Sequence, residues 1–301
     1  MSSCLRWMQI TPFFQINQTI LHLARNHTVK KLTLDFSQST THGLPLCVFL
    51  LHHLTDLYLK NCDINHKPII SGFGPFSSIT SLSLKLSGCR RISRETLLHV
   101  LTTCPSLKRL CLLVYEGSFR GYEKPNIVHL FKCLPVIEHL TISGHILSLL
   151  VKASVPEKPP PSLVHLKYLC IKELNFADDY GLTFLAVLIK CSPNLEKIKL
   201  VSDAIDHDEE GESVKLREYS YIQLEHLNEL EIKFFSNKKH EMELVKFILA
   251  RSPSLKKVRL LTAMICKNEA LEVLEILLRS PRASPIEIVA ENLCHYQFYY
   301  Y

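Results

Sequence analysis

One short hydrophobic phrase recurs along nearly the whole chain and constrains its fold more than any other feature. In each copy an apolar residue is followed three and five positions later by two more. Alternate residues of a β-strand face opposite sides, so the last two apolar residues are expected inside and the residue between them outside. Each copy therefore predicts one short strand, and nine copies occupy residues 29–34, 54–59, 79–84, 107–112, 137–142, 166–171, 195–200, 227–232 and 255–260.

The spacing between these copies indicates a repeat architecture. Counted at the fourth residue of each copy, from Leu32 to Val258, successive copies lie 25, 25, 28, 30, 29, 29, 32 and 28 residues apart, and a last fragment counted at Ile286 adds a further 28. This period, with its L-x-x-L-x-L phrase, is typical of leucine-rich repeats. Apolar residues between the copies have helical spacing, as in Leu97 and Leu101. The predicted fold class is α/β, a leucine-rich-repeat solenoid with a parallel strand ribbon on the concave side and helices on the convex side.

Proline marks the junction between several predicted helices and the strands that follow them. The sequences are Cys-Pro-Ser-Leu at 104–107, Cys-Ser-Pro-Asn-Leu at 191–195 and Ser-Pro-Ser-Leu at 252–255. Proline ends a helix because it lacks an N–H and disfavours the helical conformation of the preceding residue. We interpret these junctions as structural corners with a buried cysteine.

Composition is typical of a globular protein from a reducing compartment. Apolar residues make up 47% of 301 residues, which suffices for a continuous core. The eleven cysteines are odd in number and include no C-x-x-C pair, so they are expected to be free and mostly in the core. The first ten residues do not resemble a signal peptide, and no apolar run approaches the roughly 20 residues of a membrane helix. The expected location is cytoplasmic and/or nuclear, with no membrane partner.

The chain shows no constellation of residues that argues for catalysis. It lacks a G-x-S-x-G elbow, a Walker loop and a G-x-G-x-x-G turn. Its fifteen histidines have no H-E-x-x-H or zinc-finger spacing, and the acidic run at 203–212 lacks the pattern of a calcium loop. We therefore expect no enzyme activity, no cofactor and no metal site, and we interpret the acidic run as a solvated loop.

The candidate partner-binding residues are the polar side chains that flank the strand leucines on the concave face. Tyrosine and arginine are frequent anchors of protein interfaces, and the C-terminal half of this face is rich in lysine and arginine. Clustered cations would attract an acidic protein segment or a small anion. The net charge of +6 is too small to indicate nucleic acid, and a monomer is expected. The candidates are Tyr58, Lys60, Arg109, His139, Tyr168, Lys172, Lys197, Lys199, Lys257 and Arg259.

These residues resemble a known family, the plant F-box/FBD/LRR proteins. The most specific similarity lies between Leu224 and about Ala290, where residues 227–232 and 243–258 are similar to the centre of the FBD module. The resemblance implies recognition of a protein substrate for a cullin-type ubiquitin ligase. An F-box is not found, so a ligase adaptor is not an expected partner. The alternatives are a shortened isoform or fragment that binds independently or as a dominant negative, and, in another class, an enzyme or enzyme inhibitor on the same scaffold.

The predicted organisation has four parts. Residues 1–28 are a capping segment, because Ile16, Ile20 and Leu23 have amphipathic helical spacing ahead of the first repeat. Residues 29–222 are irregular leucine-rich repeats, 223–290 are FBD-like C-terminal repeats, and 291–301 are an aromatic tail.

Overall fold

The computed structural model divides the chain into two compact units, Met1–Pro161 and Ser162–Tyr301. We describe each unit by itself. The residues that the structure describes are 3–7, 13–26, 28–36, 43–64, 76–86, 92–114, 119–120, 127–146, 163–176, 179–202, 221–262 and 267–292.

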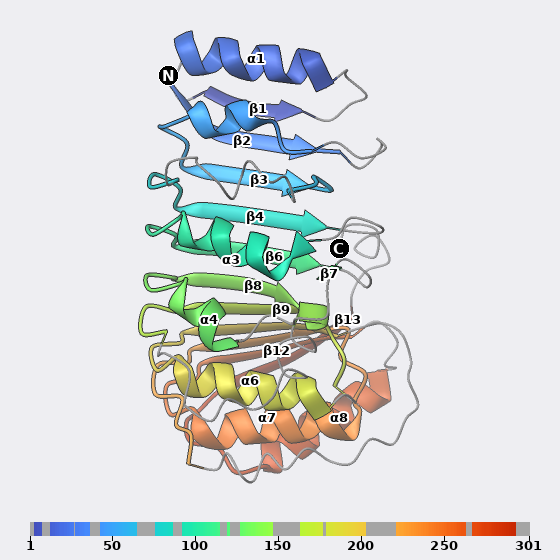
Figure 1. Ribbon diagram of the computed structural model, residues 1–301. Helices are drawn as coiled ribbons and strands as arrows, with labels where there is room; N and C mark the ends of the chain where they lie inside the picture. The colour runs from blue at the N-terminus through green and yellow to red at the C-terminus, as the bar shows by residue number, and fades with distance from the viewer. Residues whose placement is uncertain are drawn as a thin grey trace. The chain divides into compact units, whose positions relative to one another are not determined.

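The described residues of the first unit form six parallel strands in the order β1-β2-β3-β4-β6-β8 (Figure 1). Helices or a 3-10 turn connect several of them, and β5 pairs with β7 in a separate two-stranded sheet. The elements are β1 (Ser3–Trp7), α1 (Phe13–Asn26), β2 (Val29–Asp35), η1 (Leu46–Leu50), β3 (Asp56–Lys60), β4 (Ser81–Leu86), β5 (Ile92–Ser93), α3 (Arg94–Thr102), β6 (Arg109–Val114), β7 (Phe119–Arg120), α4 (Ile127–Lys132) and β8 (His139–Ser143).

In the second unit, the part of the chain that the structure describes forms five parallel strands in the order β9-β10-β11-β12-β13. Three helices of 13 residues each lie on one side of these strands (Figure 1). The elements are β9 (Tyr168–Leu174), α6 (Asp179–Cys191), β10 (Lys197–Ser202), β11 (Glu229–Lys233), α7 (Lys239–Arg251), β12 (Lys257–Thr262), α8 (Lys267–Arg279) and β13 (Glu287–Asn292).

Equivalent leucines of successive repeats lie side by side in the core of each unit. Leu32 is in register with Leu57, and Leu57 with Leu82, while Ile198 is in register with Leu230. All five side chains are buried. Each strand thus supplies one layer of apolar contacts to the next, and the predicted leucine-rich-repeat solenoid is confirmed.

The structure corrects the sequence analysis at both ends. Ser3–Trp7 forms β1, a strand parallel to β2 that was not predicted, because its five residues lack the full repeat phrase. At the other end, Val258 pairs in register with Ile288 and not with Ile286, the residue used to count the last interval. The last repeat is therefore two residues longer than the sequence count gave. The count chose the wrong residue because Ile286 and Ile288 are both apolar, and either could occupy the position that pairs with Val258. The boundaries between the four predicted parts stay predictions.

Two corners of the second unit bury a serine hydroxyl that has no hydrogen-bond partner among the described residues, Ser192 and Ser252. A buried unpaired hydroxyl costs about 1–3 kcal/mol. We therefore expect Ser192→Ala and Ser252→Ala each to raise the free energy of unfolding by about 1 kcal/mol in urea titrations. Ser143 is the matched control, since its buried hydroxyl donates to the Val114 carbonyl (2.8 Å) and accepts from the Val114 N–H (3.2 Å). Ser143→Ala should be destabilising, and equal losses in all three variants would contradict the prediction.

Candidate protein-interaction face

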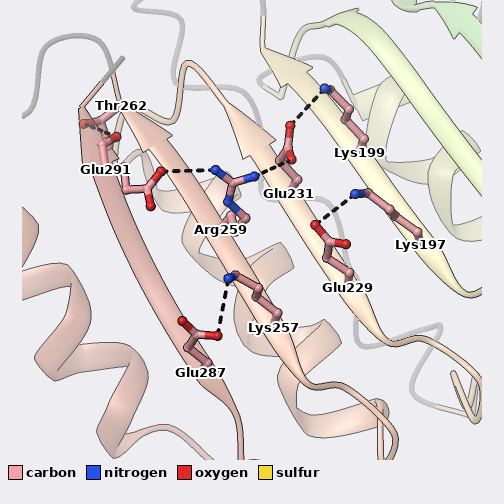
Figure 2. A network of polar contacts seen from close by, with 9 residues as sticks. All are labelled: Lys197, Lys199, Glu229, Glu231, Lys257, Arg259, Thr262, Glu287 and Glu291. Atoms are coloured by element: carbon pink, nitrogen blue, oxygen red, sulfur yellow. Dashed lines mark hydrogen bonds and ion pairs between the residues drawn. The ribbon is translucent and has the colours of Figure 1, made fainter. Parts of the chain in front are cut away.

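The sheet of the second unit has an outward face formed by alternate residues of its strands. In β10 and β12 the first and third residues are half-buried, whereas the second and fourth are in the core. The parallel register brings these outward residues into two rows that run across the strands. We call the eight charged residues of the two rows the charge ladder, namely Lys197, Lys199, Glu229, Glu231, Lys257, Arg259, Glu287 and Glu291 (Figure 2).

The first row alternates in sign from strand to strand. Lys197, Glu229, Lys257 and Glu287 occupy the same register position on β10, β11, β12 and β13. The Lys197 ammonium lies 2.9 Å from the Glu229 carboxylate, and the Lys257 ammonium lies 3.4 Å from that of Glu287. The row therefore consists of two neighbouring ion pairs, and in each pair the cation lies on the strand that comes earlier in the chain.

The second row is centred on Glu231. One of its carboxylate oxygens lies 2.9 Å from the Lys199 ammonium, and the other lies 3.4 Å from the Arg259 guanidinium. Arg259 also reaches diagonally to Glu291, at 3.2 Å, because Val289 and not Glu291 is its register partner (Figure 2). The four side chains thus form a continuous network over four strands.

Glu231 is the most buried member of the charge ladder, with only 5% of its surface exposed. Burial alone would raise the pKa of its carboxyl. Lys199 opposes this effect through its hydrogen bond and its charge, and the charges of Lys197 and Lys233 act in the same direction as Lys199. Together they bring the pKa of Glu231 below its ordinary value. Glu231 is therefore ionised at neutral pH and holds Lys199 and Arg259 in place.

Tyr168 and Lys172 extend the face onto β9. Tyr168 is in register with Lys197 and is half-buried, and burial raises the pKa of its phenol above the ordinary value, with a further contribution from Cys170. The phenol is therefore neutral at physiological pH and can both donate and accept a hydrogen bond. Lys172 lies further along the same strand and is also half-buried.

A polar groove borders this face where the strands begin. It has a volume of about 410 Å³, and the Lys167–Glu196 ion pair (3.1 Å) lies in it. The amide of Asn194 donates to the Val164 carbonyl, so its orientation is fixed. The lining side chains come from four successive repeats and are Val164, His165, Lys167, Asn194, Glu196, His226, Asn228 and Ser254.

The strand face of the first unit is less charged. Lys60 on β3 lies 3.3 Å from the Asp35 carboxylate on β2, and Lys85 lies over the Tyr58 ring at 5.5 Å from its centroid. Arg109 on β6 reaches past β4 to Asp56 on β3, at 3.5 Å.

His139 completes the residues predicted on this face. It is in register with Arg109 on the neighbouring strand. The structure therefore brings Arg109 and His139 together, and it places Tyr58 and Lys60 on β3. The remaining six predicted residues lie on the second unit.

Three acidic partners of the predicted cations, Glu229, Glu287 and Glu291, were not predicted. The C-terminal half of the face was expected to be basic, whereas every cation of the charge ladder lies beside a carboxylate. Glu229 and Glu287 could have been found, because they occupy the same repeat position as Lys197 and Lys257. Glu291 could not, because its contact with Arg259 is diagonal. The face alternates in charge and is not uniformly basic.

Within the described ranges, no group of three or more His, Cys, Asp or Glu side chains is arranged to hold a metal ion. The acidic run at 203–212 lies outside those ranges. Among the described cysteines, Cys104 is buried, and burial raises the pKa of its thiol to about 11. No helix in the described part of the chain is long and apolar enough to cross a membrane.

This chain is similar to a curated relative and, more distantly, to a solved structure. An F-box/FBD/LRR-repeat protein of Arabidopsis thaliana, At1g13570, is 23% identical to this chain over 90% of the chain and 74% of the relative. Among solved structures, the crystal structure of the TLR13–ssRNA13 complex matches with a TM-score of 0.43 and 12% identity. That match covers 90% of this chain but only 41% of the TLR13 chain.

The leucine-rich-repeat fold indicates a protein-interaction module, and a binding scaffold is the usual role of this class. The model of one family, described as At1g61320/AtMIF1, LRR domain, matches residues 121–292, more than half of the chain. The chain belongs to this family. The resemblance to plant F-box/FBD/LRR proteins is confirmed by the Arabidopsis relative.

Proposed function

We propose that the chain binds a protein partner through its strand faces, with the charge ladder and the adjoining groove as the principal contact surface. The observation that carries this proposal is the in-register alternation of charge over four strands. Half-exposed ion pairs contribute only about 0–1 kcal/mol each to stability. Complementary charge patterns, by contrast, determine which partner binds and in which register.

The partner fitted by this surface is a polypeptide segment of mixed charge. A uniformly acidic segment would meet Glu229, Glu231, Glu287 and Glu291 as well as the cations. A segment with both signs can place a carboxylate beside each cation and a cation beside each carboxylate. Tyr168 and Lys172 would border the charge ladder. Tyr58, Lys60, Arg109 and His139 would form a separate contact on the first unit.

The cellular role that we propose is substrate recognition for a ubiquitin ligase, in the cytoplasm or nucleus. Support comes from the Arabidopsis relative, whose name includes an F-box beside the FBD and leucine-rich repeats. Co-purification with the ligase adaptor would support a role in the ligase. Stable partner binding without the adaptor would support an independent or dominant-negative binder.

The decisive variant exchanges the cation and the carboxylate within each ion pair of the first row. Exchanging both pairs, Lys197→Glu with Glu229→Lys and Lys257→Glu with Glu287→Lys, keeps the net charge and leaves each pair intact. We expect capture of the specific partners in affinity purification and mass spectrometry to fall at least about tenfold, which corresponds to roughly 1.4 kcal/mol. The melting temperature should be unchanged, because each exchanged pair retains its attraction.

The matched control exchanges an ion pair in the first unit, Lys60→Asp with Asp35→Lys (3.3 Å apart). It should affect capture less than the first-row exchange. Equal capture by wild type and the first-row variant would remove the charge ladder as the contact surface. Reversing the four cations alone is a poorer test, because it would place new carboxylates beside Glu229, Glu231 and Glu287 and destabilise the sheet.

A further inference from the structure

Helix α8 carries an exposed leucine stripe that the core of the second unit does not use. Val273 and Leu277 are buried and face the strands. Leu271 and Leu278 are 61% and 49% exposed, and Leu274 between them is half-buried. The spacing i, i+3, i+7 places these three leucines along one side of the helix.

Comparison with the preceding helix shows that the repeat does not require this stripe. Helices α7 and α8 both have 13 residues and align without gaps through their inward residues, Val245 with Val273 and Leu249 with Leu277. At the positions of Leu271, Leu274 and Leu278, helix α7 has Glu243, Lys246 and Ala250. Lys246 and Ala250 are exposed, so this side of α7 faces solvent.

On the opposite flank the two helices differ in burial. Leu244 and Ile248 of α7 are buried, whereas the equivalent residues of α8, Glu272 and Ile276, are exposed. This flank of α8 therefore combines one glutamate with one exposed isoleucine. Only the leucine stripe replaces the polar residues Glu243 and Lys246 of α7 with large apolar side chains.

We infer that the leucine stripe of α8 is a contact surface for a second copy of this chain, formed by antiparallel packing of two α8 helices about a two-fold axis. An interface of this symmetry uses the same patch on both copies. With the axis between Leu274 and Glu275, Leu271 of each copy lies opposite Leu278 of the other. This proposal goes beyond the proposed function and departs from the monomer expected from the sequence.

The charges beside the stripe match such a pair. Glu275 and Arg279 flank the leucines on one side and form an ion pair at 3.4 Å within the helix. In the antiparallel arrangement the two Glu275 and two Arg279 side chains form one cluster with two charges of each sign. Both residues are exposed. Replacing their contact within one helix by a contact between the two copies therefore changes the free energy little.

The size of the surface determines the expected strength. A 13-residue helix is about 20 Å long. Two such helices bury an area at or below the low end, about 1,200 Å², of stable interfaces. The dimer should therefore form reversibly and depend on concentration. It would present two charge ladders in one assembly, which raises the avidity for a partner with two binding segments.

Sedimentation velocity of the full chain over a concentration series tests the inference. We expect a monomer–dimer equilibrium in the wild type. Leu271→Gln with Leu278→Gln should weaken the dimer at least about a hundredfold, on the order of tenfold per leucine. The matched control is Ile276→Gln, an exposed apolar residue on the other flank, which should dimerise like the wild type. Thermal unfolding verifies that each variant folds.

A charge exchange tests the antiparallel geometry. Glu275→Arg alone gathers four cations at the seam and Arg279→Glu alone gathers four carboxylates, so each variant should be monomeric. Mixed in equal amounts, the two variants should form a heterodimer. A wild type that stays monomeric at its highest soluble concentration overturns the inference, as does a dimer that persists in the double leucine variant or one that Ile276→Gln abolishes. None of these outcomes decides whether the charge ladder of a single copy binds a partner, so failure of the dimer and failure of the proposed function are distinguishable.

Discussion

Replacing Glu231 by glutamine is expected to lower the free energy of unfolding by about 2–3 kcal/mol at pH 7. Its carboxylate is nearly buried and contacts two cations, Lys199 at 2.9 Å and Arg259 at 3.4 Å. A neutral amide leaves both cations without this carboxylate, and only Arg259 keeps a second one, Glu291. Urea titration at neutral pH measures the loss.

Glu229→Gln is the matched control for this prediction. Glu229 occupies the first row of the same strand, has one ion-pair contact (Lys197, 2.9 Å), and its side chain is more exposed than that of Glu231. The expected loss is below about 1 kcal/mol, as for other partly exposed pairs. Equal losses in the two variants would mean that Glu231 does not organise the second row.

The pH dependence gives an independent measurement at Glu231. Its folded pKa is lower than its unfolded pKa, so its contribution is complete above the unfolded value of about 4.5 and is lost as pH falls through the folded value. Between pH 7 and pH 3 the wild type should therefore lose more stability than Glu231→Gln. A constant difference between the two proteins over this range would contradict the lowered pKa.

Glu241→Gln is expected to have the opposite dependence on pH. Glu241 lies in the first turn of α7, where one buried carboxylate oxygen accepts hydrogen bonds from the backbone N–H groups of Ser236 (2.9 Å) and Lys238 (3.2 Å). These bonds and the Lys238 charge oppose the effect of burial, but burial dominates and raises the pKa of Glu241 to about 7.

The sign follows from a folded pKa that lies above the unfolded value of about 4.5. The protonated carboxyl stabilises the fold, fully at pH below 4.5, and this contribution is lost as pH rises through 7. Between pH 5 and pH 8 the wild type should lose about 2–3 kcal/mol that Glu241→Gln does not lose. Glutamine keeps the acceptor oxygen for both backbone groups, so the start of α7 is preserved.

Unfolding titrations of wild type and Glu241→Gln at pH 5 and pH 8 measure this difference. A second control, Glu241→Ala, removes the acceptor and should be destabilised at both values, since losing a helix cap costs about 1 kcal/mol. Parallel profiles for wild type and the glutamine variant would show that Glu241 does not titrate in this range.

The sequence by itself determined the repeat and its strands. The phrase L-x-x-L-x-L places two leucines on one side of each strand, and its regular spacing requires successive strands to stack in register. Leu57, Leu59 and Leu82 therefore lie in the core where the sequence predicts them. The outward position of Lys197, Lys199, Lys257 and Arg259 follows from the same alternation, because local periodicity decides which side a strand residue faces.

Only the tertiary structure decided what these outward residues contact. Contacts such as Lys199 with Glu231, or Arg259 with Glu291, join residues about 30 positions apart, and they depend on the register between strands and on diagonal reach. The last strand shows the same limit, because Ile286 and Ile288 fit the repeat equally well and pairing with Val258 selects Ile288. The leucines of α8 likewise have a helical spacing that the sequence displays, but their exposure depends on which side of the helix the strands cover.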